Sequence, residues 1–338
     1  IVVMIFAAVM TVSSPVFAGE TFAVVSRSVA SGTFIQLLEK HDSWSKAQWE
    51  RLFDQLQSVG LRQIVVQWAV TDNLAFYPTQ SFKQASRPPL ETILQMAEIR
   101  GIEVYIGLAH DSLYWGKIQQ APVYLEEYLK HLRLRSELVA REVASLSLKY
   151  SAFKGWYITE EIDDVTWGPP RKRTLLYQHI GQLSQYLKKL TPGYAVMLSA
   201  FSSNQLSPDS YGDFVQHLLS GSSVDILLFQ DSIGTGKLSL EYLPLYLQAV
   251  KNATDAQRRK LQVVVELFQM ISESPFAARP ADMPRIGQQL KLAAGYSNAG
   301  IGSFSMPDYL LQDNEKPASS LQQDYQRYLL LTTLPAPK

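Results

Sequence analysis

Three glutamates stand at the ends of strand-like runs, and their positions suggest acid–base chemistry. Glu160 and Glu161 follow the aromatic, β-prone run "GWYIT", and Glu266 follows three valines in "VVVELF". A glutamate after an apolar strand is partly desolvated, so neighbours from other strands set its pKa. Cleavage of a glycosidic bond needs two such carboxyl groups. One protonates the leaving oxygen, and the other attacks the anomeric carbon or activates water.

Amide, imidazole and aromatic side chains accompany these carboxylates at the ends of the other strand-like runs. Sugar hydroxyls pair with amides and carboxylates, and sugar rings lie against aromatic rings. A carbohydrate is therefore the predicted substrate. The candidate contact residues are Gln36, Gln67, Trp68, His110, Trp115, Trp156, Tyr157, Gln230, Asp231 and Phe304. The amides are expected on the rim, because an unpaired buried amide is costly.

Each candidate also has a structural interpretation. Glu266 is consistent with an interior charge that an Arg or Lys from another strand neutralises. The doublet Glu160–Glu161 is consistent with a solvated strand end followed by the cap of the next helix. Any single tryptophan is as consistent with core packing as with stacking on a sugar.

The elements that must position these residues alternate regularly along the chain. Short β-rich runs occupy 32–38, 62–70, 102–110, 153–160, 194–201, 224–230, 261–268 and 300–306. Helical patterns follow them at 45–60, 88–101, 122–150, about 171–190, about 208–219, 239–253, 281–298 and 319–331. Repeated βα order implies parallel strands with helical crossovers, and eight units predict a closed (β/α)8 TIM barrel. An open doubly wound sheet is the alternative, but no G-x-G-x-x-G follows the first strand.

In such a barrel the chemistry lies at the carboxyl ends of the strands. Strands four and seven lie on roughly opposite sides, so their terminal glutamates can face each other across the mouth. Side-chain alternation places Tyr157, Thr159 and Glu161 on one face of strand four. Trp156, Ile158 and Glu160 lie on the other face. Register alone does not decide which glutamate faces the mouth.

These positions resemble the large clan of retaining glycosidases built on (β/α)8 barrels. The resemblance implies Glu160 or Glu161 as acid/base and Glu266 as nucleophile, with carboxyl groups about 5 Å apart. That clan usually has Asn directly before its acid/base, whereas this chain has Thr159-Glu160-Glu161.

A narrower resemblance is carried by "SGTFIQ", "SKAQWERLFDQLQSVGLRQIVVQW", "GWYITEEID" and "FQDSIGTG". Together these motifs are similar to a bacterial family called domain of unknown function 4434, over residues 31–310. Members of that family are glycosidase-like barrels, often exported. The resemblance favours Glu161 over Glu160 as the acid/base.

Composition narrows the class and the location. Lys+Arg and Asp+Glu number 31 each, which argues against nucleic acid as the main partner. An apolar run and the small-x-small site Val16-Phe17-Ala18 predict a signal peptide over 1–18, with one barrel domain over 19–338. With no cysteine in the chain and no second long apolar run, a periplasmic or secreted protein without a membrane span is expected.

Two other functions remain open from the sequence. One is a non-catalytic carbohydrate-binding barrel that assists polysaccharide assembly or export. The other is a metal-dependent polysaccharide deacetylase, with ligands from His41-Asp42 and His110-Asp111. No H-x-x-E-H or H-x-x-x-H spacing supports a metal, so no metal or other cofactor is predicted. The G-x-S-x-G elbow of serine hydrolases does not occur.

Overall fold

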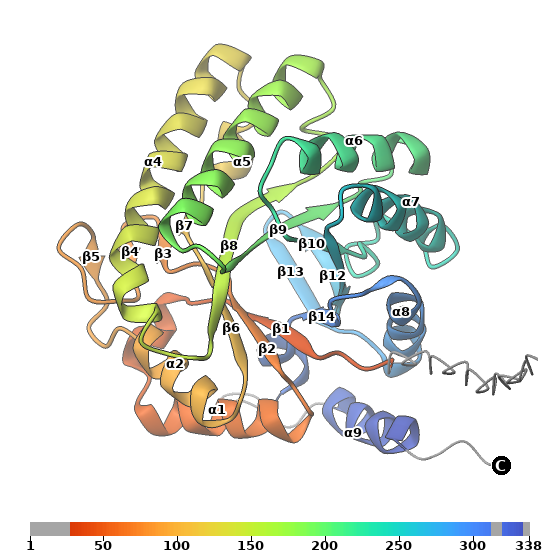
Figure 1. Cartoon of the computed structure of the whole chain (residues 1–338). Coiled ribbons are helices and arrows are strands. Elements are labelled where there is room, and N and C mark those ends of the chain that lie inside the picture. The colour runs from red at the N-terminus through yellow and green to blue at the C-terminus, as the bar shows by residue number, and fades with distance from the viewer. Residues whose placement is uncertain (1–27, 312–319, 334–338) are drawn as a thin grey trace, which may run out of the picture.

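A computed structural model describes residues 28–311 and 320–333 of the protein (Figure 1). The predicted signal peptide lies outside these residues. Eight parallel strands form the central sheet, in this order around it: β1 (Gly32–Ile35), β2 (Gln63–Val66), β6 (Glu103–Gly107), β8 (Phe153–Ile162), β9 (Ala195–Phe201), β10 (Ile226–Gln230), β11 (Lys260–Glu266) and β14 (Ile301–Phe304).

The first and last strands meet, so the sheet is a nearly closed barrel. The Ser31 amide donates to the Ile301 carbonyl at 2.9 Å, and the Ser303 hydroxyl donates to the Gly32 carbonyl at 2.8 Å. Neighbouring strands run parallel throughout, as expected when each strand returns through a helix. The predicted (β/α)8 class is therefore confirmed.

Helices surround the strands in Figure 1. They are α1 (Lys46–Ser58), α2 (Leu90–Ile99), α4 (Pro122–Ser147), α5 (Pro170–Leu190), α6 (Pro208–Ser220), α7 (Leu243–Ala256), α8 (Met283–Tyr296) and α9 (Ser320–Thr333). Their starts follow local chemistry. Ser45 precedes α1, and its amide donates to Gln48 Oε1 at 2.9 Å. Asp282 caps α8 by accepting from the Arg285 amide at 2.8 Å.

Two smaller sheets lie beyond the carboxyl ends of the barrel strands. A four-stranded sheet joins β3 (Val70–Thr71), β4 (Leu74–Ala75), β5 (Lys83–Gln84) and β7 (Ala109–His110). A hairpin of β12 (Phe268–Glu273) and β13 (Phe276–Pro280) follows strand seven. The remaining short elements are α3 (Tyr114–Lys117), a 3-10 turn (Glu39–Ser43) and a π-helical turn (Met306–Leu310). The sequence pattern did not predict the hairpin.

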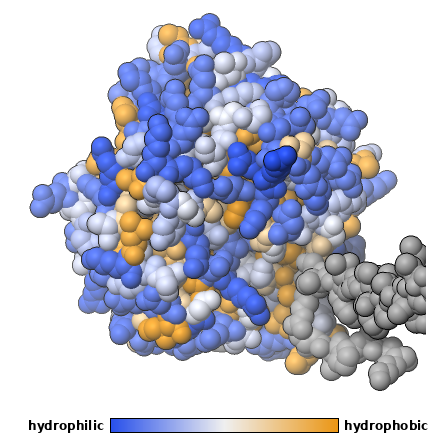
Figure 2. Space-filling view, in the orientation of Figure 1, coloured by the Kyte–Doolittle hydropathy of each residue, from blue (hydrophilic) through white to orange (hydrophobic). Residues whose placement is uncertain are grey.

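Apolar side chains fill two separate layers. One lies inside the barrel and contains Phe34, Val65, Tyr105, Tyr157, Met197, Ile226, Leu228 and Val264. The larger layer lies between the strands and the helices. The face of the molecule shown in Figure 2 is mostly hydrophilic, with apolar side chains in small separate groups. Among the described residues no helix is both long and apolar enough to cross a membrane.

The second and third strands of the barrel, β2 and β6, approach each other closely at Gly107, just below the mouth. A Cβ at this position would lie 2.1 Å from the carbonyl oxygen of Gln67. Backbone on both sides must shift to relieve such a contact, because neither partner is a flexible side chain. Glycine is therefore required here by packing.

Gly107→Ala is expected to lower the free energy of unfolding by about 1–3 kcal/mol through this clash. Gly295→Ala in α8 is the control, because an added Cβ there meets no atom within 4 Å. The control should unfold at the parent's denaturant concentration or slightly above it. Equal midpoints for Gly107→Ala and the parent would contradict the close approach.

Candidate active site

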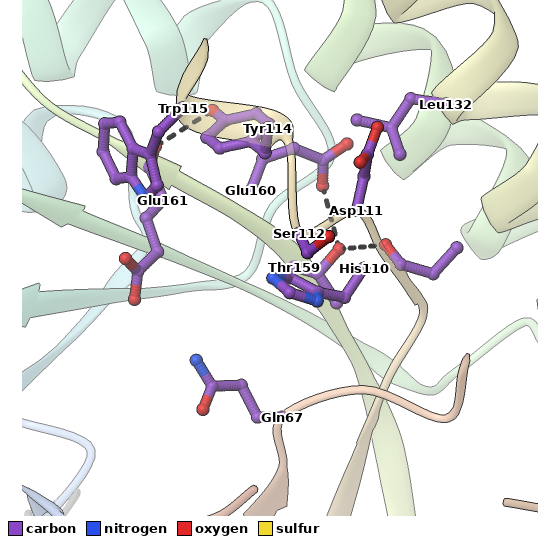
Figure 3. A pocket seen from close by; sticks show the side chains of 11 residues that line it. Gln67, His110, Asp111, Ser112, Tyr114, Trp115, Leu132, Thr159, Glu160 and Glu161 are labelled. Atoms are coloured by element: carbon purple, nitrogen blue, oxygen red, sulfur yellow. Dashed lines mark hydrogen bonds between the residues drawn. The ribbon is translucent and has the colours of Figure 1, made fainter. Parts of the chain in front are cut away.

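A two-residue bulge in β8 separates the two adjacent glutamates. Ile158 pairs with Leu198 of β9, and the next pair is Glu161 with Ser199, so Thr159 and Glu160 have no partner in β9. Since two residues are inserted, Glu161 keeps the inward orientation of Tyr157. Figure 3 shows the two carboxylates pointing in different directions.

Glu161 lies at the mouth, partly exposed. Its Oε1 accepts from Gln230 Nε2 at 3.1 Å, and its backbone carbonyl accepts from the Tyr114 hydroxyl at 3.0 Å. Burial raises the pKa of Glu161, and the Gln230 bond and the Lys237 charge only partly oppose this. The carboxyl group is thus disposed to keep a proton longer than a free glutamate does.

Glu160 is 2% exposed and turns toward the helix layer. Its Oε1 lies 2.6 Å from Nε2 of His179 on α5. Glu160 also forms part of the pocket wall beside the mouth. The proposed alternative acid/base therefore already has a buried partner.

Glu266 ends strand seven on the inward side, as Val264 does, and is 3% exposed. Its Oε2 accepts from the Thr235 amide at 2.9 Å. A Cβ on Gly234 would lie 2.9 Å from the same oxygen, so glycine allows this approach. Burial and then the nearby Asp231 charge raise the pKa of Glu266. The backbone amides of Thr235 and Gly234, and Arg285, oppose that rise.

One loop therefore contacts both mouth glutamates. Gln230 at its start holds Glu161, and Thr235 holds Glu266. The loop connects β10 to α7 and contains the motif "FQDSIGTG". Lys237 from the same loop lies 4.4 Å from the centre of the Phe201 ring and contributes positive charge near Glu161.

The structure places Asp231 away from the mouth. It is fully buried, and its Oδ2 accepts from Gln289 Nε2 of α8 at 2.6 Å. Alternation explains this, because Gln230 faces inward and its neighbour must face outward. The prediction that Asp231 contacts substrate is therefore wrong. Burial raises its pKa, and its charge acts on Glu266.

A cavity of about 70 Å³ opens beside Glu161 (Figure 3). It is lined by Gln67, Ala109, His110, Asp111, Ser112, Tyr114, Trp115, Leu132, Thr159, Glu160 and Glu161. The buried Oε1 of Gln67 has no hydrogen-bond partner. Trp115 is 41% exposed and packs beside Phe201. This part of the mouth thus offers an unpaired amide, carboxylates and an accessible ring.

Trp68 and His110 form one stacked pair in this region. Their ring centres lie 4.3 Å apart at 20°, and Trp68 Nε1 donates to the Leu37 carbonyl at 2.6 Å. His110 Nδ1 lies 3.0 Å from Thr71 Oγ1, and burial lowers the pKa of His110. Trp68 is buried, so its ring packs against His110 and supports it.

Two further aromatic candidates are out of reach of a ligand. Trp156 is fully buried in the layer facing the helices, where Nε1 donates to Thr191 Oγ1 at 2.8 Å. Tyr157 is fully buried inside the barrel and donates to Ser199 Oγ at 2.9 Å. The prediction that they contact substrate is wrong, because neither ring reaches the mouth.

The opposite side of the mouth is aromatic. Phe304, partly exposed, lies 5.6 Å from Phe34 and 6.3 Å from Phe268 between ring centres. Tyr309 packs on Phe268 at 5.3 Å. Gln36, one residue after β1, is also partly exposed. Phe268 and Tyr309 follow strands seven and eight in the sequence but were not among the predicted contact residues. They lie in the hairpin and in the π-helical turn, which the sequence pattern did not predict.

The residues of the metal alternative have protein partners. Asp42 accepts from the Arg87 amide at 3.0 Å, and Asp111 accepts from Lys117 at 2.8 Å. Within residues 28–311 and 320–333 there is no group of three or more His, Cys, Asp or Glu residues placed to hold a metal ion.

Fold and site together define a TIM barrel with inward glutamates at the ends of strands four and seven. The chain belongs to the family described as domain of unknown function 4434, whose model matches residues 30–320. It is 28% identical over 236 residues to the uncharacterized protein YbcH of Escherichia coli K12, covering 69% of this chain and 75% of that protein.

Solved structures show the same architecture. A proposed alpha-L-fucosidase of Bacteroides thetaiotaomicron superposes with a TM-score of 0.74 at 18% identity, covering 91% of this chain and 98% of that one. An endo-1,4-beta-D-mannanase of Thermotoga petrophila gives 0.59 at 12% identity, covering 90% and 99%. At these identities the likeness establishes the fold.

The raised pKa of Glu266 predicts that this residue costs stability. Between the unfolded value of about 4.3 and the raised folded value, the unfolded chain has lost a proton that the folded protein keeps, so stability falls as pH rises. Glu266→Gln keeps an acceptor for Thr235 and removes the charge. It should raise the free energy of unfolding at pH 7 by at least about 1 kcal/mol, the equivalent of roughly one pKa unit.

Glu142→Gln is the control, and it is expected to change the free energy of unfolding in the opposite direction. The Glu142 carboxylate accepts from the hydroxyls of Tyr77, Thr79 and Ser81. Burial raises its pKa, but these three bonds outweigh burial and lower it. Its stabilisation is present above the unfolded pKa and is lost as pH falls, so this variant should be less stable than the parent at pH 7. Thermal unfolding between pH 4 and 8 checks both, and a Glu266→Gln variant that tracks the parent at every pH contradicts the interpretation.

Proposed function

We propose that the chain is an exported glycoside hydrolase that cleaves a poly- or oligosaccharide, with bacterial exopolysaccharides among the candidates. The observation that carries the proposal is the convergence of Glu161 and Glu266 on one mouth, where a single loop holds both. The glycosidase titles of the structural neighbours agree with it. The apolar start of the chain supports export.

The proposed reaction is double displacement. Glu161 donates its proton to the glycosidic oxygen, while a Glu266 oxygen attacks the anomeric carbon and the bond to the leaving group breaks. Glu161, now ionised, removes a proton from water, and the resulting hydroxide displaces Glu266 from the anomeric carbon. The raised pKa of Glu161 suits the first step, since it keeps the acid protonated.

Glu266 must be ionised to attack. The amides of Gly234 and Thr235 and the charge of Arg285 favour its anion, whereas burial and Asp231 oppose it. Arg285 also donates to the backbone carbonyls of Glu266 at 2.9 Å and Phe268 at 2.6 Å, which holds its charge near Glu266. A proton on Asp231 would remove the negative charge that raises the pKa of Glu266, and would thereby favour the Glu266 anion.

The second candidate is a carbohydrate-binding barrel without catalysis. The observation that favours it is the raised pKa of Glu266, because a protonated glutamate is a poor nucleophile but a good hydrogen-bond donor to sugar. The exposed Trp115 and the partly exposed Phe304 would serve either function.

Activity of variants separates the two functions. Glu266→Ala and Glu161→Ala should each lower turnover of a cleaved glycan roughly 10³-fold or more, while binding persists. Added azide should restore turnover with an activated aryl glycoside. Glu266→Ala should yield a glycosyl azide of inverted anomeric configuration, and Glu161→Ala one of retained configuration, as roles of nucleophile and acid/base require.

Glu103→Gln is the matched control, because this exposed glutamate begins β6 at the opposite end of the barrel. It should cleave like the parent. A parent that binds glycans but cleaves none of a panel of exopolysaccharides and oligosaccharides would support the binding barrel instead.

Asp231→Asn tests the charge acting on Glu266. Removing a negative neighbour lowers the pKa of Glu266, so the acidic limb of the pH–rate profile should move to lower pH. The profile of kcat/KM measures this. A limb that stays in place or moves upward would contradict the assigned coupling.

A further inference from the structure

The wall of the barrel is crossed by one buried contact directly behind the acid/base. Glu160 and His179 are 2% and 4% exposed, and Oε1 and Nε2 are 2.6 Å apart. Glu160 belongs to the β8 bulge and also lines the pocket at the mouth. His179 lies on α5 and reaches the floor of an outer groove of about 260 Å³ between α4 and α5. The contact thus joins the bulge to the helix layer.

The bulge lacks the ladder partners that hold an ordinary strand. Thr159 and Glu160 face no residue of β9, so other bonds must keep them in place. Thr159 Oγ1 donates to the Ala109 carbonyl at 2.5 Å, and the Tyr114 hydroxyl donates to the Glu161 carbonyl at 3.0 Å. The Glu160–His179 contact is the third attachment, and it links a bulged side chain to helix α5 of the outer layer.

The bulge determines the position of Glu161 along the direction of strand β8. In a regular strand Thr159 would follow Ile158 into the position opposite Ser199. Glu161 would then lie two residues farther along, a displacement of ~6.6 Å at the rise of a parallel strand. It would lose the Gln230 bond and its place opposite Ser199. A reacting geometry tolerates far less than that, since about 1 Å can cost 10²-fold in rate.

We propose that Glu160 and His179 are positioning residues that lock the bulge and so hold Glu161 at the height at which it meets a glycosidic oxygen. The role assigned to Glu161 rests on the proposed function, whereas the lock itself does not. Glu160 would then need no contact with substrate. Its side chain stabilises the geometry of its neighbour through the wall of the barrel.

The test compares three variants of the full chain. His179→Leu removes the polar partner, and His179→Gln retains an N–H donor at a similar reach. Ser184→Ala is the control on the same helix, because Ser184 is buried and accepts from the Ser223 amide at 2.9 Å without touching the bulge. Each is measured for kcat and KM on a cleaved glycan, and for amide hydrogen exchange at residues 159–162.

We expect His179→Leu to lower kcat about 100-fold with KM nearly unchanged, and His179→Gln to recover most of that loss. Exchange at 159–162 should accelerate in His179→Leu and stay at the parent rate in Ser184→Ala. Ser184→Ala should keep the parent kcat even if it unfolds more easily.

Two results would overturn the lock. One is unchanged exchange at 159–162 in His179→Leu. The other is a loss of kcat in Ser184→Ala as large as in His179→Leu, which would mean general destabilisation. If the parent cleaves no glycan, the proposed hydrolase fails, and the exchange measurement by itself still decides whether the lock exists.

Discussion

The mouth of this barrel depends on burying carboxylates that have few hydrogen-bond donors. Each desolvated carboxylate must find compensation or keep its proton. The last residue of β10, Gln230, supplies a side-chain donor to Glu161, and Thr235 of the loop that follows supplies a backbone donor to Glu266. Because both bonds originate in residues 230–235, the relative placement of the two glutamates depends on one short segment. The close approach of Gly234 to Glu266 shows how tightly that segment packs.

Arg285 contributes positive charge near two buried carboxyl groups at the end of strands six and seven. Asp231 and Glu266 are both buried, and the charge of Arg285 acts on both of them. Burial raises the pKa of both carboxyl groups, the Asp231 charge adds to the rise at Glu266, and Arg285 opposes the rise in each. Gln289 bonds to Asp231 from α8, and thereby connects this proton balance to the helix layer. The protonation of Glu266 is therefore a property of the pair.

The barrel could be predicted from the sequence because each strand and each helix has a recognisable local pattern of apolar and polar residues. Side-chain alternation along β10 also predicts that Asp231 points outward. Asp231 was nevertheless assigned to the rim, because it is polar. Trp156 was misplaced for the same reason, since alternation groups it with Ile158 on the outer face. The bulge at Thr159–Glu160 was beyond prediction, because inserting two residues preserves the period of two and leaves no trace in the pattern. The hairpin at 268–280 and its aromatic contacts arise from tertiary packing.

Asp164 and Glu142 accept more hydrogen bonds than the two mouth glutamates do. Asp164 accepts four bonds, from Ser202 Oγ and the amides of Ser203, Gln205 and Leu206, and so fixes the loop after strand five. Glu142 accepts three hydroxyls and secures the segment around Tyr77. These bonds stabilise the ionised form of both carboxyl groups and so contribute to the fold. Glu161 and Glu266 have fewer donors and raised pKa values, so their remaining lone pairs and protons are available to whatever enters the mouth. The same shortage of donors that costs stability is what leaves these two groups able to react.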